Sequence, residues 1–193
     1  IGPLWSRPNT FGTGVPFSFP GSPDQGAGLT DTGKALVKAC DQMNILLDVS
    51  HLNEAGFWDI SRLSQQPLLA SHSNAHALCP SPRNLTDRQL DAVAESGGLV
   101  GVCFATAYLR SDGRKDSATE IELVIRQLAY LIDRMGEDHV GLGSDFDGAV
   151  LPNDLSDCSQ LPILLKAMQT NGFGDKLILK LCWDNWYQQI KRL

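Results

Sequence analysis

The chain has 193 residues, a formal net charge of −6 at pH 7 and a sequence pI near 5.1. An acidic chain without a cluster of Lys and Arg argues against a nucleic-acid-binding surface. A hydrophobic content of 42% and a charged content of 20% fit one globular domain over residues 1–193. No apolar run reaches the roughly 20 residues of a membrane-spanning helix, so we expect no transmembrane segment.

The first 29 residues are rich in Gly, Pro, Ser and Phe and carry no helical or strand periodicity. They predict an irregular loop region over residues 1–29, ordered around its aromatic side chains, with a loose terminal arm as the alternative. Regular structure is expected from Thr30 onwards, because Thr30 is a suitable N-cap for an apolar stripe at helical spacing.

Short apolar runs predict four buried β-strands. These are Ile45–Val49, Leu68–Ser71, Leu99–Phe104 and Val140–Gly143. Helices are predicted around them, at about 30–43, 53–64, 86–96, 118–135, 161–170 and 175–190. The helix near residue 86 opens on a capping box formed by Thr86 and Gln89.

Alternation of strands with helices predicts parallel strands joined by right-handed crossovers. An eight-stranded barrel takes about 250 residues. We therefore predict an α/β fold that forms the C-terminal half of a (β/α)8 TIM-type barrel, with residues 30–193 as the βα units. A small open sheet is the alternative, although no Gly-rich phosphate loop follows the first strand.

His51, His72 and Asp145 each follow a predicted strand closely, so parallel strands would bring them to one mouth. Two neutral imidazoles suit zinc, and also manganese, iron or cobalt. A metal held there lowers the pKa of a bound water to about 7, and Asp145 is placed to orient that hydroxide and take its proton. The alternative is that each histidine caps a strand through backbone hydrogen bonds.

Other polar residues near the strand ends have alternative interpretations. Arg83 could clamp a carboxylate or be a solvated loop arginine. Tyr108 lies beyond the third strand and could contact a ligand or simply pack. Asp48 could support a metal ligand, and His76 could share a helix face with His72.

Several motifs together resemble the membrane (renal-type) dipeptidase family of the metal-dependent amidohydrolase superfamily. The motifs are LLDVSH (46–51), ASHSNAHAL (70–78), PRNLTD (82–87) and HVGLGSDFDGA (139–149), with GLTDTGKALVKACDQMN (28–44) and DNW (184–186) also fitting. The resemblance covers essentially the whole chain from about Trp5.

The resemblance implies a barrel with two zinc ions at its C-terminal mouth and hydrolysis of dipeptides that have a free carboxyl end. His51 and His72 match the two histidines that bind one zinc ion. Arg83 matches the arginine that holds the substrate carboxylate, and Tyr108 matches a substrate-contacting tyrosine. Asp145 matches the catalytic acid near the bridging water and the substrate amine.

The family's His-x-Asp pair, bridging glutamate and carbonyl-polarising histidine have no counterpart in this sequence. We therefore expect the C-terminal part of a zinc dipeptidase, at most weakly active by itself. The alternatives are a related amidohydrolase acting on N-acyl amino acids, and a non-catalytic half-barrel that pairs through its edge strands. A homodimer is also possible.

The five cysteines are odd in number, scattered and without a C-x-x-C pair. They predict reduced, mostly buried thiols. Unpaired thiols and the absence of a leader in this chain favour a cytoplasmic location, although the chain opens on Ile1 rather than Met and a targeting segment upstream is equally open.

Overall fold

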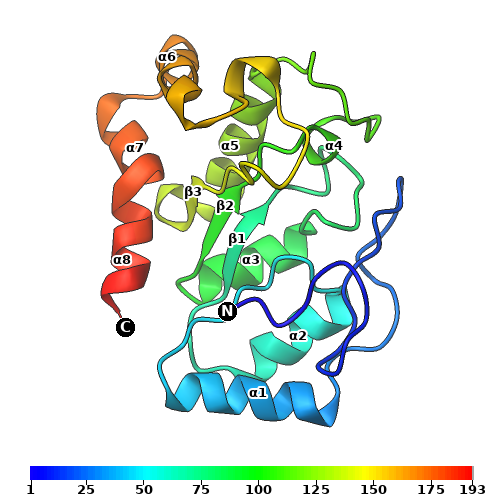
Figure 1. Cartoon of the computed structure of the whole chain (residues 1–193). Helices are drawn as coiled ribbons and strands as arrows, with labels where there is room; N and C mark the ends of the chain where they lie inside the picture. Colours follow the sequence, from blue (N-terminus) through cyan, green and yellow to red (C-terminus); the bar gives the residue numbers. More distant parts are fainter. Residues whose placement is uncertain (193) are drawn as a thin grey trace.

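The structure of the chain is a computed structural model that describes residues 1–192 (Figure 1). Its centre is a parallel sheet of three strands in the order β1-β2-β3. The strands are β1 (Leu69–Ser73), β2 (Leu99–Val102) and β3 (Val140–Leu142). All four residues of β2 are buried, as expected for a strand that is covered on both faces.

The prediction of a fourth strand at Ile45–Val49 is wrong. This segment runs beside β1 but forms only one isolated parallel bridge, between Asp48 and Leu69. The Val49 N–H donates to the Leu69 carbonyl at 2.7 Å, but the next donor along β1, the Ser71 N–H, goes to the Asp48 carboxylate at 2.9 Å. A side chain therefore takes the place of the next backbone bond and ends the ladder.

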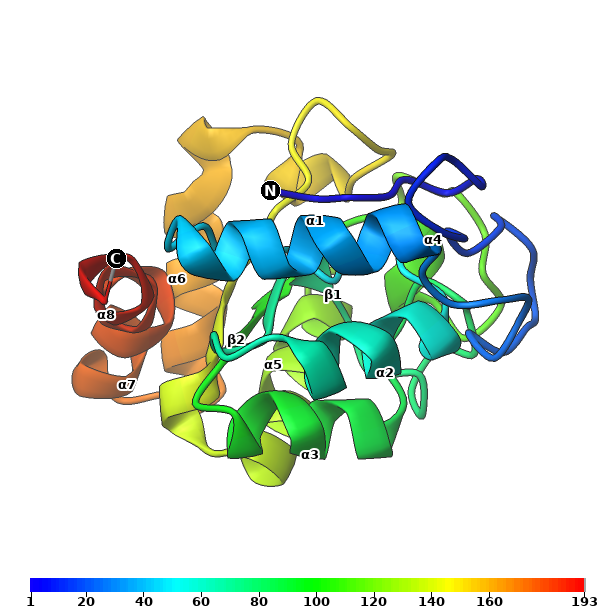
Figure 2. The same cartoon turned by 90° about the horizontal axis from the view of Figure 1, so that it is seen from below.

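Helices surround the sheet (Figures 1 and 2). They are α1 (Asp31–Gln42), α2 (Glu54–Leu63), α3 (Asp87–Glu95), α4 (Thr106–Leu109), α5 (Glu122–Met135), α6 (Leu161–Thr170), α7 (Asp175–Leu179) and α8 (Asn185–Lys191). A π-helical turn, Lys180–Asp184, joins α7 to α8, and short 3-10 turns lie at Glu137–His139, Asn153–Leu155 and Cys158–Gln160. Helix α3 packs on α5, and α8 packs beside β2 and β3.

The helix starts follow the caps read from the sequence. The Thr30 hydroxyl accepts the Gly33 N–H at 3.0 Å, and the Thr86 N–H donates to Gln89 Oε1 at 2.9 Å. Helix α5 begins later than predicted, at Glu122, and it is preceded by a turn in which the Asp116 carboxylate accepts the Ala118 N–H. Helix α4 was not predicted.

Residues 1–29 contain no helix or strand and pack against the rest of the chain. Leu4, Val15 and Leu29 are buried and Phe11 packs against the core, whereas Trp5 is 50% exposed and Phe17 is 53% exposed. The aromatic side chains are therefore not the main anchors of this segment. The Val15 N–H donates to the His51 carbonyl at 2.9 Å, which fixes the segment beside the strand ends.

All five cysteines are free, and Cys40, Cys79 and Cys103 are buried, as predicted. Within residues 1–192, no helix has both the length and the apolar character needed to cross a membrane.

Candidate metal centre

His51 and His72 converge on one point. The His51 Nε2 and His72 Nε2 atoms lie 3.0 Å apart. His72 belongs to β1, and His51 follows the segment that runs beside that strand. Two ring nitrogens that face each other at this distance are placed to share a cation between them.

Each imidazole is oriented through its other ring nitrogen. Ser6 Oγ lies 2.9 Å from His51 Nδ1, and Ser71 Oγ lies 2.7 Å from His72 Nδ1. Ser71 also donates its hydroxyl proton to Asp48 Oδ2. Because a hydroxyl has one proton, Ser71 accepts the Nδ1–H of His72, which leaves His72 Nε2 unprotonated, the form that accepts a hydrogen bond from His51 Nε2 or binds a metal ion.

Asp48 supports this arrangement as a carboxylate. Burial alone would raise the pKa of Asp48, but hydrogen bonds from Ser71 and Ser50 outweigh burial and hold the pKa below its ordinary value. The Asp48 Oδ1 atom accepts the Ser50 N–H at 3.0 Å and the Ser71 N–H at 2.9 Å. Asp48 therefore stays charged and fixes the direction of the Ser71 hydroxyl.

Both histidines are neutral at pH 7. Burial, followed by the positive charge of Arg83 and by repulsion from His72 whenever that ring is protonated, lowers the pKa of His51 to about 3. Burial and Arg83 also lower the pKa of His72, against the opposing carboxylates of Asp145 and Asp48. Neutral imidazole is the form that binds a metal ion.

The backbone is unusual at two residues of the site. His51 has φ of 71° and Asp145 has φ of 65°, in the left-handed region that few residues other than glycine adopt. Such conformations cost of order 1 kcal/mol or more and gather at functional sites. Asp147 shares this conformation, and the Gly148 N–H closes a turn on the Asp145 carbonyl at 3.1 Å, so Asp147-Gly148 lies in a turn.

Asp145 follows β3 and is contacted by a residue that the sequence did not single out. The Cys103 thiol points to Asp145 Oδ2, with the sulfur 3.8 Å from that oxygen. Burial raises the pKa of the Cys103 thiol to about 12, so the thiol keeps its proton and can donate it to the carboxylate. Cys103 directly follows β2, as Asp145 follows β3, and this position after a strand could have marked Cys103 as a candidate site residue.

Arg83 is placed behind Tyr108. Its side chain is 3% exposed, its Nη2 donates to the His72 carbonyl at 3.0 Å, and its Cζ lies 5.3 Å from the Tyr108 ring centroid. Its Nε is buried and has no hydrogen-bond partner among residues 1–192. Arg83 is therefore not the solvated loop arginine that was the alternative.

Two buried amides that the sequence analysis did not predict, Asn74 and Asn84, hold this corner together. The Asn74 side chain donates to the Cys103 carbonyl at 3.0 Å and accepts the Cys103 N–H at 3.1 Å. Asn74 and Asn84 both donate to the Tyr108 carbonyl, at 3.2 Å and 3.0 Å. The backbone of Tyr108 is therefore fixed from two sides.

The imidazoles open into a cavity of about 1140 Å³. His51, His72, Tyr108 and Asp145 all line it, whereas Arg83 does not. The other lining residues are Gly2, Pro3, Leu4, Trp5, Asn9, Phe17, Asp48, Ser50, Ala105, Ala107, Lys115, Asp147, Gly148, Ala149 and Val150. A volume of this order holds a small peptide.

The remaining histidines lie elsewhere. His76 Nε2 contacts the Gly21 carbonyl at 2.8 Å, and His139 Nδ1 contacts the Gly98 carbonyl at 2.8 Å. In the described part of the chain, residues 1–192, no group of three or more His, Cys, Asp or Glu side chains is placed to hold a metal ion. His51 and His72 therefore offer two neutral imidazole ligands to a metal ion. These two ligands do not complete the coordination of the metal.

A parallel α/β sheet with two supported imidazoles and a carboxylate at its strand ends is an arrangement typical of metal-dependent hydrolases. The chain belongs to the membrane dipeptidase family, peptidase family M19, whose family model matches residues 4–192.

Solved and curated relatives agree with this membership. A metallo peptidase from Rhodobacter sphaeroides, solved with a phosphinate mimic of the dipeptide L-Ala-D-Ala, is 57% identical and superposes with a TM-score of 0.97 over 99% of this chain. A protein from the pqqA 5′ region of Klebsiella pneumoniae is 52% identical over 100% of this chain. The dipeptidase ataJ of Aspergillus terreus is 36% identical over 77% of this chain.

The chain is shorter than these relatives. It spans 54% of the Rhodobacter structure, 71% of the Klebsiella protein and 36% of the Aspergillus dipeptidase. The activity of the longer proteins is therefore considered for this chain only as a proposal.

Proposed function

We propose that this chain forms part of a zinc-dependent dipeptidase that hydrolyses dipeptides with a free C-terminal carboxylate. The observation that carries the proposal is the 3.0 Å approach of the His51 and His72 Nε2 atoms inside a cavity that Asp145 also lines. The solved relative that binds a phosphinate mimic of L-Ala-D-Ala supports a dipeptide as the substrate class.

We propose the C-terminal half of a (β/α)8 barrel as the wider fold. Three parallel strands in sequence order, plus the 45–49 segment beside β1, fit four consecutive βα units with their carboxyl ends at one mouth. In the complete site, which would hold two zinc ions, His51 and His72 would hold one of them. A bound divalent cation supplies a water with a pKa of about 7 and polarises the scissile carbonyl.

Asp145 is proposed as the proton carrier. It accepts the proton of the attacking water and delivers it to the leaving amine, so that hydrolysis gives one carboxylate and one amine. The Cys103 thiol, 3.8 Å from Asp145 Oδ2, holds one carboxylate oxygen and leaves the other for the cavity. The left-handed backbone at Asp145, with φ of 65°, fixes the approach of the side chain.

Arg83 and Tyr108 are proposed to bind the substrate carboxylate. Tyr108 lines the cavity, and Arg83 lies directly behind its ring with a spare Nε donor. A carboxylate that displaces the Tyr108 ring would meet a guanidinium that burial has already freed from water. This charge-assisted contact would favour substrates with a free carboxyl end over blocked peptides.

The test compares three compounds on the purified chain with added zinc: Ala-Ala, N-acetyl-alanine and Ala-Ala amide. We expect binding of Ala-Ala, detected by calorimetry, with slow hydrolysis or none, and weaker binding of the amide. Tighter binding and turnover of N-acetyl-alanine would instead support the related amidohydrolase. Equal binding of all three compounds, or of none, would contradict the proposal.

A further inference from the structure

Among residues 1–192, Lys115 is the one Lys or Arg side chain that lines the cavity. It comes from a loop that has no role in the proposed chemistry. Lys115 lies in the segment 111–118 between α4 and α5, and it lines the cavity together with Asp48, Asp145 and Asp147. Within residues 1–192, Lys115 takes part in no ion pair. Its ammonium group is therefore free to meet an anion that enters the cavity.

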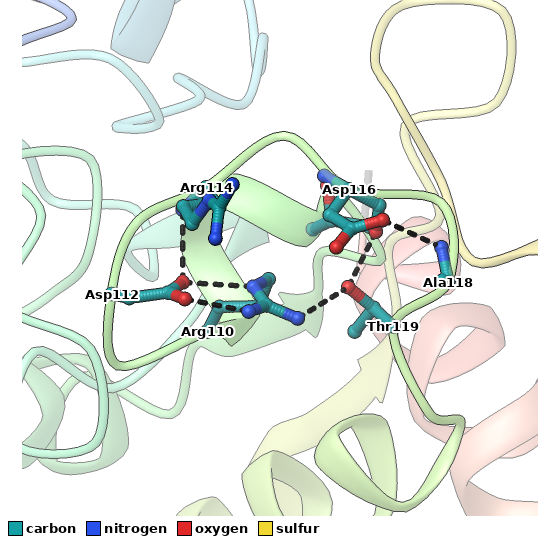
Figure 3. Close-up of polar contacts among 7 residues, drawn as sticks. Arg110, Asp112, Arg114, Asp116, Ala118 and Thr119 are labelled. Atoms are coloured by element: carbon teal, nitrogen blue, oxygen red, sulfur yellow. Dashed lines mark hydrogen bonds and ion pairs between the residues drawn. The ribbon is translucent and has the colours of Figure 1, made fainter.

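The loop is held in shape by a single guanidinium (Figure 3). Arg110 Nε donates to Asp112 Oδ1 at 2.8 Å, and Arg110 Nη2 donates to Asp112 Oδ2 at 2.6 Å. The same side chain reaches the far end of the loop, where Nη1 donates to Thr119 Oγ1 at 3.4 Å. Arg110 thus ties the two ends of the loop to each other.

The backbone on both sides of Lys115 is also fixed. The Arg114 N–H donates to Asp112 Oδ1 at 3.1 Å. The Asp116 N–H donates to Thr106 Oγ1 at 3.2 Å, and this threonine begins α4. The neighbours of Lys115 are therefore anchored, and only its flexible stem has to be ordered when it binds an anion.

The N-terminal segment supports the loop from another side. Gly113 has φ of 66°, and a Cβ at this position would lie 2.3 Å from Phe19 Cγ. The Phe19 ring therefore lies directly against the loop backbone, in a space that only glycine leaves open. The loop is packed as well as hydrogen-bonded, so the backbone from which the exposed Lys115 side chain extends is held in place.

We infer that Lys115 selects dipeptides that carry a second carboxylate in a side chain. The inference rests on the proposed function, in which the C-terminal carboxylate goes to Arg83 and Tyr108. A neutral dipeptide then leaves the Lys115 ammonium group without an anion, whereas an aspartyl or glutamyl side chain supplies one. Opposite charges in a partly enclosed cavity attract more strongly than they do at an open surface.

The experiment uses phosphinate mimics of Ala-Glu, Ala-Gln, Glu-Ala and Gln-Ala, which are not hydrolysed. Within each pair, the acidic and amide side chains have the same shape and differ in charge. Affinities for the zinc-loaded chain are measured by calorimetry. We expect at least one pair to favour the acidic member by roughly fivefold, as for a partly exposed ion pair.

Variants test whether Lys115 causes the preference for the acidic mimics. Lys115→Ala should abolish the preference without changing the affinity for the amide mimics, and Lys115→Arg should retain it. The matched control is Arg114→Ala, which removes one positive charge at the adjacent position, from a side chain that does not line the cavity. It should leave the preference intact.

The outcomes separate this inference from the proposed function. No acidic preference in either pair, or an equal loss in Arg114→Ala and Lys115→Ala, would overturn the role of Lys115. If neither the acidic nor the amide mimics bind the chain with zinc, the proposed function itself fails.

Discussion

The Nε2 atoms of His51 and His72 lie 3.0 Å apart, although the two residues are separated by 21 positions in the chain. Neither nitrogen is turned toward the other by a direct backbone contact. Instead, Ser6 and Ser71 hold the Nδ1 atoms on the outer sides of the rings. The convergence therefore depends on supports that reach the imidazoles from two different segments.

Asp48 is expected to govern metal affinity without touching the metal. Asp48→Asn can donate where the carboxylate only accepts, so the Ser71 hydroxyl is free to turn and no longer fixes the His72 tautomer. We expect a 10- to 100-fold loss of zinc affinity, the usual effect of removing such a support. Calorimetric zinc titration measures this loss, with the exposed Asp31→Asn as the control. An unchanged zinc affinity in Asp48→Asn would show that Asp48 does not support the metal site.

We expect the Cys103 thiol to lower the stability of the folded chain at alkaline pH. Its pKa is about 12 in the folded chain and 9.0 in the ordinary case. The unfolded chain therefore loses this proton first, and the stability that the thiol contributes is lost as pH rises above 9. We measure the free energy of unfolding in urea between pH 9 and 11. It should fall more steeply for the wild type than for Cys103→Ser, and the two slopes should differ by up to about 1.4 kcal/mol per pH unit. Parallel curves for the two proteins would contradict this.

Arg83 is expected to act on substrates through their free carboxylate. Arg83→Met keeps most of the buried stem but removes the charge, and it should weaken binding of a phosphinate dipeptide mimic by roughly tenfold or more. The corresponding C-terminal amide should bind both proteins equally. The matched control is Arg88→Met, because Arg88 lies over the Trp58 ring, with its Cζ 5.5 Å from the ring centroid, and does not line the cavity. A similar loss for the mimic and its amide would point to structural damage instead.

Gly113 and Gly172 offer a paired test of the loop packing. Both have positive φ, 66° and 83°, but only Gly113 faces a side chain, the Phe19 ring. Gly172→Ala should cost about 1 kcal/mol in free energy of unfolding, from backbone strain alone. Gly113→Ala should cost at least about 1 kcal/mol more, because the ring must move. Equal costs in urea unfolding would show that Phe19 does not hold the loop.

The sequence predicted that His51, His72 and Asp145 would lie near each other, and all three line one cavity, although His72 lies within β1 and no strand precedes His51. It failed where a polar side chain replaces a backbone partner. Asp48 stands in an apolar run that reads as a strand, and its carboxylate ends the ladder that the run would otherwise form. Nothing local to residue 48 shows this, because the partner, Ser71, is 23 positions away.

The corner around Tyr108 was missed for the same reason. Asn74 contacts the Tyr108 carbonyl across 34 positions, and the Cys103 thiol meets Asp145 across 42. These contacts are set by which strands lie side by side, and periodicity carries no such information. Lys115 stands in a loop whose shape depends on Arg110 and on Phe19 from the N-terminal segment.

The central claim is that His51 and His72 together hold a divalent cation. Calorimetric titration with zinc tests it on the wild type, His51→Ala and His72→Ala, with His76→Ala as the control, since His76 contacts the Gly21 carbonyl instead. The account predicts one zinc site in the wild type and in His76→Ala, and its loss in each of the other two variants. Zinc binding that survives in both His51→Ala and His72→Ala would contradict the account.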